Sequence, residues 1–88
     1  MSTPHDVERR LRWANAYLAG ERIAGVKFRH NSLVRFTDQH GDSSEGWTVT
    51  VRPSEPEPVY VVERADGAGD EEVSESLIEL ISDRDETL

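Results

Sequence analysis

The hydrophobic residues near the start of the chain repeat with the period of a helix. Thr3 and Pro4 are typical of a helix start, because a threonine can cap the first turn and a proline there loses no hydrogen bond. Gly20 is typical of a helix end. Steps of four, three and four put four apolar residues on one face: Val7, Leu11, Ala14 and Leu18. The pattern predicts a helix from about Thr3 to Ala19 that packs on the domain through this face.

After residue 25 the period changes to two, which is typical of β-strands. Apolar and polar residues alternate from Val26 to Phe36 around a turn at Asn31 and Ser32, which predicts a hairpin. A polar loop follows at 38–46. Alternation then returns over 47–52 and predicts a strand whose apolar face holds Trp47, Val49 and Val51.

Three further segments complete the pattern. Val59 to Val62 is apolar throughout, which predicts a strand covered on both sides, with the N-terminal helix as one cover. Glu71 to Ser74 fits a short edge strand. The last apolar group fits one face of a short helix better than a strand: Leu77, Ile78, Leu80 and Ile81.

Together these elements predict one small α+β domain over residues 1–82, with 83–88 as a frayed acidic tail. The N-terminal helix packs on a curled antiparallel sheet of four or five strands, and a short C-terminal helix follows. Periodicity leaves open whether the sheet closes into a small barrel or stays an open meander.

The spacing of the strand segments carries a resemblance to a known class. The segments read SLVRF, EGWTVTV, VYVVERADG and EEVSESL, and they span roughly residues 32–77. This spacing resembles that of small Tudor-type or KOW-type modules of the SH3-like β-barrel class. The resemblance implies a recognition module without catalysis.

Composition narrows the function classes. The chain has 88 residues and no cysteine, which excludes a disulfide framework, a zinc-thiolate site and a thiol nucleophile. Its net charge of −8 disfavours nucleic acid and anionic membranes as partners. The polar start of the chain and its short apolar runs predict a cytoplasmic protein with no signal peptide or membrane span.

One candidate partner-binding surface lies on the N-terminal helix. Trp13 and Tyr17 form an i, i+4 pair beside the apolar face, with Arg10 on the same flank. Tryptophan, tyrosine and arginine are common interface anchors, so this flank is a candidate site for a protein partner or for a homodimer. The alternative is that the two aromatic side chains close over the rim of a small core.

A second candidate surface follows from the distribution of charge. Residues 66–88 carry nine acidic groups and one basic group, whereas residues 1–36 carry seven basic and three acidic groups. The acidic surface would include Asp70, Glu71, Glu72, Glu75 and Glu79. These carboxylates predict, as an alternative function, an acidic regulator or inhibitor, such as a nucleic-acid mimic, that docks on a basic protein surface.

The sequence offers little catalytic chemistry. Asp38, His40 and Asp42 alternate in the polar loop, but no fourth ligand is nearby, so we predict no metal site. No serine has a histidine at a recognisable motif spacing, and no glycine-rich phosphate loop follows a strand. We therefore predict a noncatalytic protein without a cofactor that binds a partner through the aromatic helix face.

Overall fold

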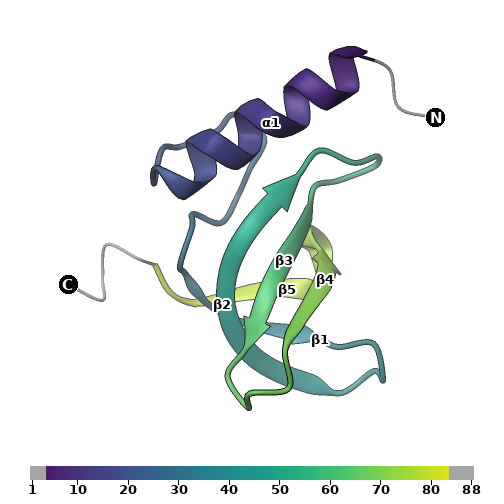
Figure 1. The fold of residues 1–88 in the computed structure, drawn as a ribbon. Helices are drawn as coiled ribbons and strands as arrows, with labels where there is room; N and C mark the ends of the chain where they lie inside the picture. The colour runs from purple at the N-terminus through teal and green to yellow at the C-terminus, as the bar shows by residue number, and fades with distance from the viewer. Residues whose placement is uncertain (1–3, 84–88) are drawn as a thin grey trace.

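A computed structural model describes residues 4–83 of the chain, and Figure 1 shows one helix lying across one end of a curled sheet. The predicted cap Thr3 lies outside the described residues, as do residues 84–88 of the predicted tail. The elements in chain order are α1 (Pro4–Leu18), β1 (Leu33–Thr37), β2 (Ser43–Arg52), β3 (Val59–Arg64), β4 (Asp70–Ser74), the 3-10 turn η1 (Glu75–Leu77) and β5 (Ile78–Ser82).

The five strands form one antiparallel sheet in the order β4-β3-β2-β1-β5. The sheet is not closed, because β4 and β5 are its two edges. β2 curves strongly along its length (Figure 1), and its pairing with β3 shifts between Thr48 and Thr50, where Val49 is an extra residue. The predicted α+β class, the N-terminal helix and the antiparallel sheet are confirmed. The sheet has five strands and is open.

The predicted C-terminal helix is wrong. Glu75–Leu77 forms only a short 3-10 turn, and Ile78–Ser82 is strand β5. The pairing with β1 explains the difference, because it places Ile78 opposite Phe36 and Glu79 opposite Arg35. A strand here supplies the hydrogen bonds that one side of β1 would otherwise lack, and a short isolated helix could not.

The predicted hairpin is also wrong in its first half, because 26–30 is irregular and only Leu33–Thr37 forms a strand. The backbone N–H groups of Lys27 and Phe28 donate to the phenol oxygen of Tyr60 instead of to a neighbouring strand. Asn31, within the predicted turn, adopts a left-handed conformation with φ of 65°. The phenol oxygen of Tyr60 thus takes the place of the backbone acceptors that a neighbouring strand would have supplied to this segment.

Hydrophobic side chains from all five strands form the core, together with one residue of α1 and one of the irregular segment. Its members are Tyr17, Phe28, Val34, Phe36, Val51, Tyr60, Val62, Val73 and Ile78. The single apolar face predicted for 47–52 is split by the extra residue in β2, so that Val51 is buried whereas Trp47 is 39% exposed.

Thr48 occupies the core position that the sequence pattern assigned to its apolar neighbours. Its Oγ1 donates to the carbonyl of Arg29 at 2.6 Å and accepts the N–H of Ser32 at 3.0 Å. These bonds satisfy buried backbone groups of the turn before β1, which explains why a threonine is tolerated inside an apolar core.

No helix among the described residues is long and apolar enough to cross a membrane.

Candidate functional site

The orientation of α1 separates the three residues predicted to bind a partner. Tyr17 lies in the core with 1% of its surface exposed, and its ring makes edge contacts with Tyr60 and His30. Trp13 is partly buried against the same core. Only Arg10 is exposed. The three side chains therefore do not form one continuous external surface.

The apolar face predicted to pack on the sheet is instead largely exposed. Val7 is 46% exposed, Leu11 59% and Leu18 57%. The prediction that this face packs on the domain is wrong for these three residues. The larger rings of Trp13 and Tyr17 bury more apolar surface than the aliphatic residues would, and this rotates α1 about its axis.

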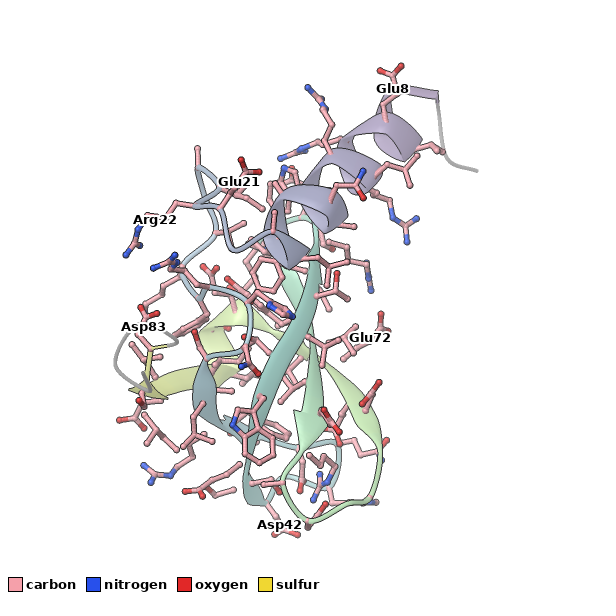
Figure 2. All side chains as sticks on the ribbon, turned by 60° about the vertical axis from the view of Figure 1, so that its left-hand side comes forward. Glu8, Glu21, Arg22, Asp42, Glu72 and Asp83 are labelled. Atoms are coloured by element: carbon pink, nitrogen blue, oxygen red, sulfur yellow. The ribbon has the colours of Figure 1, made fainter. Side chains whose placement is uncertain are left out.

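A groove of about 490 Å³ runs between α1 and the nearby strands. Its lining is mainly apolar, with charged groups at the rim: Val7, Arg10, Leu11, Ala14, Thr50, Val51, Arg52, Val61 and Glu72. In Figure 2, Glu72 points away from the sheet in the space below α1, while Asp42 marks the opposite end of the molecule. The exposed residues Val7 and Leu11 of α1 thus share this groove with residues of β2, β3 and β4.

The charges around the groove are not balanced. Arg52 Nε is paired with Glu72 Oε1 at 3.1 Å. Arg9 lies over the ring of Trp13, with its guanidinium carbon 5.1 Å from the ring centre. Within residues 7–83, Arg10, the basic residue of α1 that lines the groove, has no ion pair with a carboxylate. The helix side of the groove therefore presents positive charge that the described acidic groups do not neutralise.

The predicted acidic surface is largely engaged in contacts within the chain. Glu72 pairs with Arg52, and Glu79 pairs with Arg35 at 3.7 Å. Glu71 pairs with Arg64 at 3.1 Å and also accepts the backbone N–H of Gln39. Glu75 accepts the Tyr60 hydroxyl. Asp70 is exposed and has no such contact within the described part of the chain.

A cluster around Arg64 joins the β1–β2 and β3–β4 loops to strands β2 and β4 at the end of the sheet away from α1. Its guanidinium contacts Asp38 at 3.3 Å, Asp66 at 2.8 Å and Glu71 at 3.1 Å, and donates to Ser44 Oγ at 3.0 Å. The bond to Asp66, followed by those to the other carboxylates, raises the pKa of Arg64 against the effect of desolvation. No spacing motif in the sequence indicates this cluster, which exists because β3 lies between β2 and β4.

The carboxylate of Asp38 accepts hydrogen bonds from several groups in and near this cluster. The hydroxyl of Ser44, together with the backbone N–H groups of Asp42 and His40 and the guanidinium of Arg64, lowers its pKa to about 2, while desolvation opposes the shift. Both carboxylate oxygens are thus acceptors for groups of the chain itself. Across residues 7–83 there is no group of three side chains positioned to hold a metal ion, at 38–42 or elsewhere.

Comparison with known proteins gave no relative: no family model, no curated protein and no solved structure matches the chain.

Proposed function

We propose that this protein is a noncatalytic protein-interaction module that binds a partner segment in the groove beside α1. The observation that carries this proposal is the exposure of Val7 and Leu11 on the border of the groove. These side chains leave apolar surface in water, and a partner that covers them gains about 25 cal/mol for each Å² buried. The groove is open to solvent, so a segment of a partner can reach these side chains.

The partner we propose is an apolar segment that also carries carboxylates, such as an acidic amphipathic helix. Leucine or valine side chains of the partner would fill the groove against Leu11 and Val61. Its carboxylates would approach the two arginines that line the groove: Arg10, which lacks an ion pair with the described acidic groups, and Arg52, which is paired with Glu72. A basic segment would meet the same arginines with unfavourable charge.

The aromatic residues of the helix support this function by positioning it. Trp13 and Tyr17 anchor α1 on the core, which holds Leu11 and Arg10 at the groove. Strands β1 to β4 lie within residues 32–77, whose strand spacing resembles that of SH3-like recognition modules, and this resemblance supports the proposal of a recognition role.

The alternative of an acidic regulator has less support from the contacts. A basic partner that docked on Glu71, Glu72, Glu75 and Glu79 would have to displace Arg64, Arg52, Tyr60 and Arg35 from them. Breaking such contacts reduces the affinity gained from new ones. We therefore place the binding surface at α1.

Nuclear magnetic resonance titration tests the proposed function. The probe is a synthetic amphipathic helical peptide of the length of α1, with leucine on one face and glutamate on the other. We expect its addition to shift the signals of Val7, Leu11 and Val61, and we expect Leu11→Asp to reduce the affinity at least 10-fold, or about 1.4 kcal/mol. Leu77→Asp is the matched control, since Leu77 is 49% exposed and lies outside the groove.

A second peptide, with lysine in place of each glutamate, separates charge from hydrophobicity. It should bind more weakly than the acidic peptide, and Arg10→Glu should reverse that order. Equal binding of both peptides, or shifts confined to β4 and η1, would rule out the proposed site.

A further inference from the structure

The two edge strands of the sheet differ in the side chains that they present. β4 has the sequence DEEVS, with Asp70 and Glu72 exposed. Negative charges of this kind protect an edge strand, because a second strand cannot approach without bringing further charge beside them. β5 has the sequence IELIS, and two of its apolar side chains, Leu80 and Ile81, are 43% and 38% exposed.

The backbone of β5 has a partner on one side only. Its strand pairing is with β1, and none of the described segments supplies a backbone hydrogen bond to its other side. Glu79 is its one charged residue, and Arg35 of the neighbouring strand pairs with it. Neither lysine nor proline, the residues that commonly protect an edge, is present in β5. This edge is therefore open to another strand.

We infer that β5 pairs in antiparallel fashion with β5 of a second copy, which joins the two sheets into one across a two-fold axis. The axis that suits the charges passes beside Leu80. It places Leu80 opposite Leu80 of the second copy, and each Glu79 opposite Ile81. An axis at Glu79 would set two carboxylates against each other, and an axis at Ile81 would set Glu79 against Asp83; both arrangements are unfavourable.

The strand of the second copy that pairs with β5 is its own β5 and not its β4. Pairing β5 of one copy with β4 of the next would bring Glu79 toward Asp70 and Glu72, and it would leave one open edge at each end. Pairing β5 with itself avoids this contact and leaves β4 as the outer edge of both subunits. The assembly therefore closes as a dimer and does not extend into a fibre. The inference is independent of the groove, whose lining includes no residue of β5.

A cysteine placed at the axis tests the arrangement directly, because the chain has no cysteine of its own. Opposed residues of an antiparallel pair have Cα atoms about 4.5–5.5 Å apart, which a disulfide can span. We expect Leu80→Cys to form a disulfide-linked dimer at least 10-fold faster than Leu77→Cys. Leu77 is a matched control, because it is 49% exposed and lies three residues from the axis. Equal rates for the two variants would overturn the inference.

The mass in solution provides a second test. Light scattering from about 1 µM to about 1 mM covers the affinities expected of a small interface. The wild-type protein should reach twice the 9.9 kDa of one chain. Leu80→Lys should remain monomeric, whereas Leu11→Lys on α1 should dimerise like the wild type. A wild-type protein that stays monomeric throughout this range, or a dimer lost with Leu11→Lys and kept with Leu80→Lys, contradicts the proposed arrangement.

Hydrogen exchange on the wild-type protein provides a third test, which does not require the variants to fold. Circular dichroism would first show whether Leu80→Lys is folded. If it is not, the wild-type protein alone decides, because amide protection within 78–82 should rise at least 10-fold between the lowest and highest concentrations, while that of β4 should not change. Protection of β5 that is independent of concentration would refute the pairing.

Discussion

Tyr60 Oη donates a hydrogen bond to Glu75 Oε2 across 2.6 Å, and the same oxygen accepts the backbone N–H groups of Lys27 and Phe28. One buried phenol thus joins β3 to the start of η1 and to the irregular segment that follows α1. Burial raises the pKa of Tyr60, and the hydrogen bond to Glu75 raises it further. The hydroxyl therefore stays protonated, as its role as a donor to a carboxylate requires.

Tyr60→Phe should lower the free energy of unfolding by about 1–3 kcal/mol, because it leaves the buried N–H of Phe28 without an acceptor. Urea denaturation at neutral pH would measure the loss. Tyr17→Phe is the control, since Tyr17 Oη is buried without a hydrogen bond of good geometry within the described structure. Burial raises the pKa of Tyr17, and the nearby Thr48 hydroxyl partly opposes this rise. This control should be at least as stable as the wild type, and an equal loss in both variants would contradict the role given to Tyr60.

Acid should destabilise the fold through Asp38. The pKa of Asp38 is about 2 in the folded protein, compared with an ordinary value of 3.8, so below about pH 4 the unfolded chain binds more protons than the folded one. The associated stability is present above this range and is lost as the pH falls through it. Ser44 and Arg64 also hold the carboxylate in place. We expect unfolding midpoints in urea to fall between about pH 4 and pH 2.

Asp38→Asn should make this decline shallower, because the substituted amide does not titrate. Asp42→Asn is the control, since Asp42 is exposed at the end of the same loop (Figure 2). Some pH dependence should remain in both variants. The pKa of Asp66 is lowered by Arg64, and that of Glu57 by Ser76. A wild-type slope retained in full by Asp38→Asn would show that Asp38 is not responsible.

Gly46→Ala should destabilise the protein although glycine is not required there by its backbone conformation. A Cβ atom at this position would overlap the carbonyl oxygen of Glu63 and approach a methyl group of Val62. Overpacking of this kind typically costs about 1–3 kcal/mol. Gly41→Ala is a useful contrast, because Gly41 has a φ of 82° but open space around it, and its conformational cost is about 1 kcal/mol. Thermal unfolding would rank the two, and a Gly46→Ala protein as stable as the wild type would refute the close approach.

Polar substitutions on the exposed face of α1 should be tolerated. Leu11→Gln and Leu18→Gln should each change the free energy of unfolding by less than about 0.5 kcal/mol, because both side chains already lie more than half in solvent. Tyr17→Ala should cost about 3–5 kcal/mol, since it removes a core ring. Thermal melts would test this difference. A large loss in Leu11→Gln would mean that this face, and not the aromatic flank, packs on the core.

Local periodicity was sufficient to predict the elements whose sequence pattern fits only a helix or only a strand. The predicted helix, the strand beginning at Val59 and the edge strand near Glu71 are all present. Periodicity could not decide the segment from Leu77 to Ile81, because its apolar residues fit a helix face as well as a strand. Only the availability of β1 as a hydrogen-bonding partner decides, and that is a property of the whole sheet.

The candidate site was predicted in part. Arg10 was found from the flank that it shares with Trp13 and Tyr17, and it does line the groove. The exposure of Leu11 was missed, since a regular apolar stripe indicates burial unless neighbouring aromatic rings displace it. The bonds of Tyr60 to Glu75 and of Arg64 to Asp38 join residues 15 and 26 positions apart. No sequence spacing encodes such contacts before the strand order is known.

The separation of charge along the chain has a consequence for how the proposed partner would approach the protein. Residues 7–31 carry six basic and two acidic side chains, whereas residues 32–83 carry three basic and thirteen acidic ones. Because α1 lies at one end of the molecule (Figure 1), the basic residues Arg9, Arg10 and Arg12 lie at that end, apart from most of the described acidic residues. An anionic segment diffusing nearby would be turned toward α1 before any contact forms. This guidance fades beyond about 10 Å at 0.1 M salt, so added salt should slow association more than it speeds dissociation.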